Sequence, residues 1–385
     1  MKFSPLVSRI SGDGADAWIT HYDALAARDR GEDVLILSVG DPDLETPAPV
    51  IARAIQRLQA GDTHYCPAPG RPAIRAAIAT AHAQRSGQHT LPGNVVYLAG
   101  AQNALFVASM CVAGPGDEVI TFDPMYPTYP ATIEVSGARM IRAASGRDFR
   151  PDLAGLAHLV NERTRAIVWA TPNNPSGVIL KESELAAIGG LAEQHDLWLI
   201  SDEVYAGLAP EGRVPGLAAR MPERVITIGS LSKSHAMTGW RAGWLVGPRE
   251  LAIHAESLIM CMLFGLPGFV QEAAITALSL GADAERRMRD YCNVRRDRMI
   301  ELLAGAPRIR PLVPAAGMFM LVDVRETGLT GYQFMRSLYE SERVSVMDGA
   351  AFGRQTAGFV RVCFATDVDS IDAACERIQR FCARN

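Results

Sequence analysis

Short apolar segments alternate with longer, helix-compatible ones between residues 94 and 247. Several of the apolar segments are nearly continuous, as expected for strands that are buried on both faces of a sheet. Connections of about 10–20 residues separate them, which predicts helical crossovers and a mainly parallel, doubly wound α/β sheet. The predicted strands are 94–100, 117–122, 138–143, 165–170, 197–201, 224–229 and 243–247.

The hydrophobic pattern changes toward the C-terminus. One long helix-compatible segment, residues 268–304, is followed by short apolar segments and two further helical patterns. The predicted strands there are 318–324, 344–347 and 359–365, and the predicted helices are 331–342 and 369–383. We therefore expect two domains, a large one of residues 40–285 and a smaller α+β domain built from residues 1–39 and 286–385.

Composition excludes several classes of partner. The net charge of −4 gives no general attraction to nucleic acid or to anionic membranes. Six arginines in residues 285–298 alternate with acids at helical spacing, which favours a solvated helix face. The seven cysteines form no CxxC pair and no HExxH motif occurs, so nothing indicates a metal site. The first residues lack a signal-peptide core, and we expect a cytoplasmic protein.

Ligands of doubly wound sheets bind at the carboxyl ends of the strands, so the loops after the predicted strands are where chemistry is expected. The loop 98–105 turns at a glycine into a helix, and the backbone N–H groups of Ala101 and Gln102 would hold a phosphate. The loop 171–177 presents the amide of Asn174. Any strand–glycine–helix turn resembles the first loop, however, and plain turn chemistry explains the second equally well.

Charged residues follow two more predicted strands. An unpaired carboxylate is costly at the end of a buried strand, so Asp202 would either pair with a protonated ring nitrogen, with Tyr205 close by, or cap the next helix. Lys233 is one of three lysines among 38 basic residues, and it lies among serines, glycines and tryptophans. An amine that is shielded from water and lies near positive charge has a lowered pKa, which favours Schiff-base formation. Three neighbours of this lysine suit one phosphate: Ser230, Ser232 and Arg241.

Residues 230–244 carry the pattern S-x-S-K-x-x-A-M-x-G-x-R-x-G, which resembles the cofactor-lysine signature of the class I/II aminotransferases, a family of fold-type I pyridoxal-phosphate enzymes. The resemblance extends from about residue 35 to the C-terminus. It implies the fold-type I architecture, pyridoxal 5'-phosphate as cofactor, and transfer of an amino group from an L-amino acid to a 2-oxo acid. The other motifs occur in the order of that family: VGDPD (39–43), HYCPAPG (64–70), GAQNAL (100–105), PMYPTY (124–129), PNNPSG (172–177), SDEVY (201–205), GMF (317–319) and RVCF (361–364).

The resemblance implies roles for individual residues around the cofactor. Lys233 corresponds to the lysine that forms the Schiff base and then moves a proton as general base and acid. Asp202 corresponds to the acid bonded to the pyridine nitrogen, and Tyr205 and Asn174 to the pair bonded to the ring hydroxyl oxygen. Tyr126 corresponds to the aromatic residue stacked on the ring.

The remaining matches concern the phosphate, the substrate and a second subunit. Arg361 corresponds to the arginine that binds the substrate α-carboxylate in a bidentate manner, with Asn174 and Gly40 nearby. Tyr65 corresponds to a tyrosine that reaches the phosphate of the other subunit, which implies a homodimer with shared active sites. The phosphate contacts correspond to Ala101, Gln102, Ser230, Ser232 and Arg241.

Two stretches bear on the amino donor. Residues 8–25 and 235–244 are similar to those of arginine–pyruvate transaminases. The apolar segment 256–269, which borders the substrate pocket in this family, carries no arginine, and this argues against aspartate or glutamate as donor. Three residues together suit a guanidinium or ammonium side chain, although helix capping or core packing explains each one singly: Asp13, Asp16 and Trp18. We therefore expect a basic donor such as arginine, with pyruvate as acceptor.

Two alternatives share the same residues. β-Lyases and decarboxylases of this fold use the same lysine and aspartate but break a different bond, so they would release ammonia or carbon dioxide. Aminotransferase-like domains also serve as non-catalytic sensors in transcription regulators. Such regulators carry an N-terminal DNA-binding domain, for which the stretch before the matching region is short.

Overall fold

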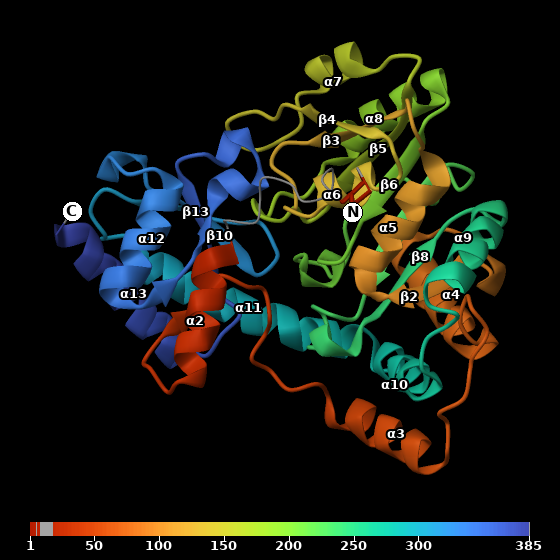
Figure 1. Cartoon of the computed structure of the whole chain (residues 1–385), viewed down its shortest axis with the longest axis horizontal. Helices are drawn as coiled ribbons and strands as arrows, with labels where there is room; N and C mark the ends of the chain where they lie inside the picture. Colours follow the sequence, from red (N-terminus) through yellow and green to blue (C-terminus); the bar gives the residue numbers. More distant parts are fainter. Residues whose placement is uncertain (5, 8–17, 385) are drawn as a thin grey trace.

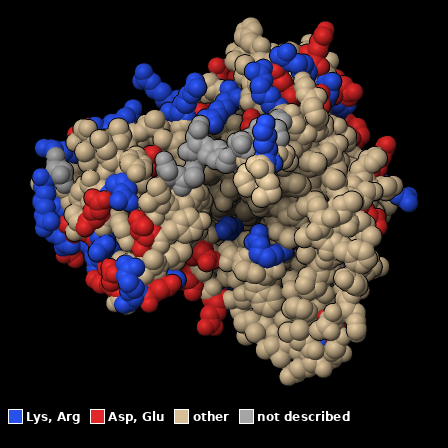
Figure 2. All heavy atoms as spheres, viewed as in Figure 1, with Lys and Arg blue, Asp and Glu red and all other residues tan. Residues whose placement is uncertain are grey.

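The computed structural model describes residues 1–4, 6, 7 and 18–384. The chain forms two lobes, each built around its own β-sheet, and the long helix α11 (Gly281–Leu303) runs from one lobe to the other (Figure 1). A hollow opens where the lobes meet, and basic side chains are visible inside it (Figure 2). Within the described ranges, no helix is both long enough and apolar enough to cross a membrane.

The larger lobe contains a seven-stranded sheet with the order β2-β8-β7-β6-β5-β3-β4. All neighbouring pairs are parallel except those of β8, which is antiparallel to both β2 and β7. The prediction of a mainly parallel α/β sheet is confirmed. β8 runs the other way because the connection 231–241 contains no crossover helix, which a parallel neighbour would require. The strands are β2 (Val95–Ala99), β3 (Glu118–Phe122), β4 (Arg139–Ala143), β5 (Thr164–Ala170), β6 (Trp198–Asp202), β7 (Val225–Ser230) and β8 (Ala242–Val246).

Helices cover both faces of this sheet, which explains why its strands are apolar along their whole length. Successive strand residues point to opposite faces. Ile167 of β5 therefore belongs to the cluster that contains Leu185, and Val168 belongs to the cluster that contains Leu105. The helices of this lobe are α3 (Ala48–Gln59), α4 (Pro72–Ser86), α5 (Gly100–Val112), α6 (Tyr129–Glu134), α7 (Leu153–Leu159), α8 (Glu182–His195), α9 (Arg249–Met262) and α10 (Gly268–Ser279).

The smaller lobe combines both ends of the described chain. Strand β1 (Leu35–Ile36), which follows α2 (Ile19–Asp29), pairs in parallel with β11 (Val344–Ser345). A four-stranded antiparallel sheet has the order β12-β13-β10-β9, and α12 and α13 pack in the same core. The remaining elements are β9 (Arg310–Leu312), β10 (Phe319–Asp323), α12 (Gly331–Glu342), β12 (Met347–Asp348), β13 (Phe359–Cys363) and α13 (Val368–Arg384).

The helix-compatible segment 268–304 is helical, but it forms two helices, α10 and α11, which are separated at Leu280. Gly281 adopts a φ of 59°, a left-handed conformation that glycine reaches without steric cost and that turns the chain between the two helices. The break leaves α10 against α3 and α4, while α11 continues into the smaller lobe (Figure 1).

Candidate active site

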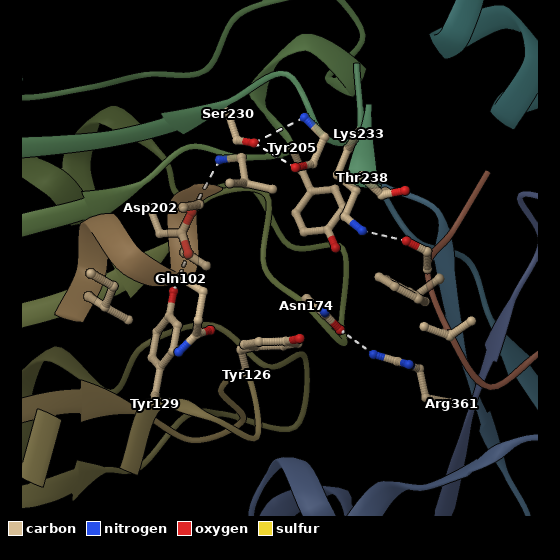
Figure 3. Close-up of a pocket in the computed structure, with 18 of the residues that line it drawn as sticks. Gln102, Tyr126, Tyr129, Asn174, Asp202, Tyr205, Ser230, Lys233, Thr238 and Arg361 are labelled. Atoms are coloured by element: carbon tan, nitrogen blue, oxygen red, sulfur yellow. Dashed lines mark hydrogen bonds between the residues drawn. The ribbon is translucent and has the colours of Figure 1, made fainter. Parts of the chain in front are cut away.

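A pocket lies between the lobes at the carboxyl ends of three neighbouring strands (Figure 3). Ala170 ends β5, Asp202 ends β6 and Ser230 ends β7, and all three line the pocket. Gly40, Phe319 and Arg361 line it from the other side. The pocket is therefore at the edge where parallel sheets bind ligands, and it is completed by the smaller lobe.

Asp202 is a buried carboxylate without a cationic partner among the described residues. One oxygen accepts a hydrogen bond from the hydroxyl of Tyr129 at 2.7 Å, and the other accepts from the backbone N–H of Val204 at 3.2 Å. Burial raises the pKa of Asp202, and the hydrogen bond from Tyr129 opposes that rise. The sequence did not single out Tyr129, although it lies in the PMYPTY motif.

Lys233 follows β7 and extends its amine into the same pocket (Figure 3). The Nζ atom donates a hydrogen bond to the carbonyl of Gly40, and no described carboxylate forms an ion pair with it. Burial lowers the pKa of this amine from 10.5 to about 8. A large fraction of Lys233 is consequently an uncharged nucleophile at mildly alkaline pH.

A seat for an anion lies where α5 begins beside β8. Gly100 adopts a φ of +83°, and a Cβ there would lie 2.5 Å from a guanidinium nitrogen of Arg241. A Cβ on Gly243 would lie 2.4 Å from the carbonyl carbon of Gly100. The start of α5 and strand β8 can therefore lie this close only because both positions are glycine. The first N–H groups of α5, beginning with Ala101, therefore face the same space as Arg241, which among the described residues bonds only backbone carbonyls.

Two serines complete this anion seat. Ser230 Oγ lies 2.8 Å from Ser232 Oγ and accepts a hydrogen bond from the backbone N–H of Ser232 at 3.0 Å. Both side chains are buried and line the pocket. Hydroxyl groups, helical N–H groups and a guanidinium thus converge on one point, an arrangement that fits a phosphate group.

Arg361 is a fully buried cation on β13, and no described carboxylate contacts it. Its guanidinium lies between the rings of Phe319 and Phe352, with centroid distances of 3.9 and 4.7 Å. It donates to the side-chain oxygen of Asn174 at 3.1 Å and to the carbonyl of Ser38, and its Nε has no hydrogen-bond partner. A buried charge without a counterion is costly, so this site suits an incoming carboxylate.

Aromatic and amide groups form the remaining walls. The Asn174 oxygen is engaged by Arg361, which leaves its amide nitrogen to donate elsewhere. The Tyr205 ring meets Phe319 edge-on, with centroids 6.0 Å apart. Trp18 lines the pocket and also packs against the cluster of Met347 and Phe352.

Most residues predicted from the sequence meet in this one pocket. Tyr65 does not line it: it is 86% exposed, with its ring against Phe264 at a centroid distance of 4.7 Å. Asp13 and Asp16 lie outside the described residues. The predicted residues that line the pocket are Trp18, Gly40, Ala101, Gln102, Tyr126, Asn174, Asp202, Tyr205, Ser230, Ser232, Lys233, Arg241 and Arg361.

The expectation that residues 256–269 border the substrate pocket is not met within a single chain. No residue of this segment lines the pocket. Its end instead forms a separate hollow with residues 63–66, which include Tyr65. The expectation came from the family resemblance. The hydrophobic pattern of one chain does not encode where a segment lies relative to a second subunit.

The residues of the pocket fit pyridoxal phosphate. The buried acid Asp202 has no cationic partner in the described part of the chain, a Cβ at Gly100 or Gly243 would fill the space beside Arg241, and Lys233 presents an amine of lowered pKa. These features match, in turn, a protonated ring nitrogen, a phosphate and an aldehyde. They lie within one cavity, as the parts of one small molecule require.

Comparisons with known proteins agree with this chemistry. The family model of aminotransferase class I and II matches residues 32–378. The chain is 46% identical to arginine–pyruvate transaminase AruH of Pseudomonas aeruginosa, over 98% of this chain and 97% of that protein. It is 32% identical to an aspartate aminotransferase of Pyrococcus horikoshii, over 91% of this chain and 90% of that protein.

Solved structures show the same fold. The structure of Thermus thermophilus aspartate aminotransferase with maleate superposes with a TM-score of 0.92, at 29% identity, and covers 99% of both chains. The aspartate aminotransferase of Thermotoga maritima also has a TM-score of 0.92, at 30% identity, and covers 98% of this chain and 99% of that one. The chain belongs to the class I and II aminotransferases and is an aminotransferase of the fold-type I architecture.

Proposed function

We propose that this aminotransferase uses pyridoxal phosphate on Lys233 to move the amino group of arginine to pyruvate. The cofactor assignment rests on one observation: a buried acid and a buried amine lie in the same pocket. Asp202 and Lys233 both lack a partner of opposite charge among the described residues. Burial raises the pKa of Asp202 and lowers the pKa of Lys233, so it favours the uncharged form of each group. These shifts are useful only if a ligand contacts both groups.

The cofactor would be held at three points. Asp202 would accept a hydrogen bond from the ring nitrogen and keep a proton there, while Tyr129 orients the carboxylate. Asn174 and Tyr205 would bond the ring hydroxyl oxygen, and the ring of Tyr126 would cover one face. The phosphate would be held by Ala101, Gln102, Ser230, Ser232 and Arg241.

The reaction then divides between the cofactor and the chain. When bound, pyridoxal phosphate supplies the carbonyl carbon that takes the amino group and a ring that accepts the electrons released at the substrate Cα. Arg361 binds the substrate carboxylate and thereby orients Cα, with Gly40 close by. Lys233, once displaced, moves the proton of Cα, and its lowered pKa suits an amine that must alternate between base and acid.

The donor assignment rests on the relative and on the charges of the pocket. The relative with 46% identity over nearly the whole chain is a transaminase of arginine and pyruvate. The arginines that line the described pocket are Arg241 and Arg361, and both already have roles. No further lining arginine remains for the second carboxylate of aspartate or glutamate, whereas Trp18 offers a ring to a guanidinium. Asp13 and Asp16 would add ion pairs.

A homodimer is the assembly that this proposal requires. Tyr65 is 86% exposed and does not line the pocket of its own chain, so its predicted phosphate contact needs a second subunit. Exposed apolar side chains gather near it, including Leu263 and Phe264. The part of Figure 2 that carries α3 and α10 shows few charged side chains, as an interface requires.

The division into residues 40–285 and residues 1–39 with 286–385 remains part of the proposal. The two separate sheets and the pairing of β1 with β11 support it. The proposed boundary at residue 285 falls inside α11, a helix that would couple the two domains mechanically.

A panel of amino donors tests the function. The protein loaded with pyridoxal phosphate is mixed with single amino acids, and the absorbance of the cofactor reports its conversion to the amine. Arginine should react with the highest second-order rate constant. Pyruvate should then restore the original absorbance. Lys233→Ala should bind the cofactor without turnover. Release of ammonia or carbon dioxide in place of a recoverable amine would instead support a lyase or a decarboxylase.

A further inference from the structure

A second hollow, with a volume of about 740 Å³, lies outside the pocket described above and shares no lining residue with it. Segments far apart in the sequence form it. Arg147 comes from the turn after β4 in the larger lobe, whereas Arg310 in β9 and Arg325 after β10 come from the smaller lobe. Figure 2 shows basic side chains gathered along the upper junction of the two lobes.

Positive charge exceeds negative charge in this arginine groove. No acid lines it. Arg310 and Arg325 share one carboxylate, that of Asp323, with N–O distances of 3.4 Å for Arg310 and 2.8 Å for the Nε of Arg325. Arg147 is exposed and has no ion pair with any described residue. The groove therefore keeps a net positive charge that an anionic ligand would neutralise.

The groove is a built structure rather than a loose surface turn. Phe149 adopts a φ of +59°, a conformation that is costly for a bulky residue, and its ring meets Phe359 of the other lobe edge-on at 5.8 Å. The guanidinium of Arg325 lies 5.1 Å from the centroid of the same Phe359 ring. These contacts hold the turn that carries Arg147 against the smaller lobe.

One polar group in the groove lacks a partner. Ser145 is only 8% exposed and lines the groove, yet its Oγ forms no hydrogen bond with any described residue. Its backbone is held firmly, because Gln355 donates to the Ser145 carbonyl at 2.5 Å and accepts from the Ser145 N–H at 3.2 Å. The two hydrogen bonds to Gln355 therefore join this wall of the groove to the smaller lobe.

We propose that this groove binds a small polyanion, a molecule with at least two phosphate or carboxylate groups, which bridges Arg147 of the larger lobe to Arg310 and Arg325 of the smaller one. Arginine forks suit both phosphate and carboxylate oxygens, so the two chemistries are distinguished by experiment.

The groove is connected to the active site by backbone contacts. The Asp123 carboxylate accepts from the N–H groups of Arg354 and Gln355, at 2.8 and 3.3 Å. The N–H of Met125, next to Tyr126 of the pocket, donates to the carbonyl of Phe352, whose ring covers Arg361. The segments 123–126 and 352–355 therefore connect the groove to the pocket.

Isothermal titration calorimetry of the protein loaded with pyridoxal phosphate tests the site, with inorganic pyrophosphate and citrate as separate probes at low ionic strength. One anion per chain should bind, and added salt should weaken it. Arg147→Ala should raise the Kd about tenfold and Arg147→Glu should abolish binding, since each removes or reverses a charge-assisted contact. Arg249→Ala is the matched control, because Arg249 is also exposed and has no ion pair among the described residues.

Each other outcome overturns the proposal. Absence of heat with both probes at millimolar concentration would exclude a polyanion site. Equal affinity of the native protein and Arg147→Ala would show that the anion binds elsewhere. Binding that is lost in Arg361→Ala but kept in Arg147→Ala would assign the anion to the active-site pocket. Thermal unfolding of each variant, measured in parallel, separates loss of binding from loss of folding. None of these readouts depends on the amino donor or on turnover.

Discussion

The hydrogen bond from Tyr129 to Asp202 gives the sharpest prediction about catalysis. Tyr129→Phe removes one hydroxyl and leaves the ring in place, where it is 2% exposed and meets Tyr126 edge-on at 6.2 Å. Asp202 then keeps only the contact with the N–H of Val204. The substitution therefore changes the carboxylate and very little of the packing.

The size of the effect follows from the bond that is lost. A hydrogen bond to a charged acceptor contributes about 1.5–3 kcal/mol. If the carboxylate is needed in the transition state to hold the proton on the cofactor ring, the half-reaction slows about 10–150-fold. The Tyr129 hydrogen bond also opposes the burial that raises the pKa of Asp202, so its loss raises that pKa further. As the pH falls, the rate of the variant should therefore begin to drop at a higher pH than the rate of the native protein.

The assay is a stopped-flow half-reaction with saturating arginine, followed by the absorbance of the cofactor between pH values of about 5 and 9. Tyr97→Phe is the matched control, because the Tyr97 hydroxyl is also buried but has no hydrogen-bond partner in the described structure. Its rate should equal that of the native protein. The reasoning is refuted if Tyr129→Phe and Tyr97→Phe have the same rate and the same pH profile.

Three further predictions concern the amine, the carboxylate site and the dimer. Uptake of pyridoxal phosphate by the apoprotein should accelerate as the pH rises through about 8, because the neutral amine of Lys233 dominates above its lowered pKa; a midpoint near the ordinary value of 10.5 would contradict this. Arg361→Lys keeps the charge but loses the planar fork between two rings, so the KM for amino acids should rise about 10–100-fold with a smaller change in kcat, and an unchanged KM would exclude Arg361 from carboxylate binding. Mixing Tyr65→Phe with Lys233→Ala should restore activity through heterodimers with one intact site, and verified heterodimers without recovery would argue against shared sites.

The local pattern of apolar residues was enough to predict the strands and the strand ends at which the pocket lies. The strands β5, β6 and β7 were recognisable because both of their faces are buried, which makes their sequences apolar throughout. Their ends carry Asp202 and Lys233, whose charge is conspicuous after an apolar run. The break inside the helical segment 268–304 was not predicted, because an isolated glycine inside a helical pattern does not reveal whether its φ is positive, as it is at Gly281.

Contacts between distant segments explain what the pattern missed. Tyr129 reaches Asp202 across 73 positions of sequence, and no periodicity links them. The direction of β8 depends on how residues 231–241 turn back beside β7. The arginine groove joins Arg147 to Arg310 and Arg325, which look like ordinary solvated charges when taken one at a time.

By itself the sequence determined the α/β class, the order of the strands along the chain and the residue types at the strand ends, because burial and backbone periodicity act over a few neighbouring positions. It also determined the aminotransferase family, because motifs in a conserved order carry the residues that the cofactor chemistry needs. Only the tertiary structure decided that Asp202 and Lys233 lack counterions among the described residues, that Arg361 contacts two rings, and that Tyr65 is exposed and outside the pocket of its own chain. Charge compensation and exposure depend on every segment that packs around a group, and those segments come together only when the chain folds.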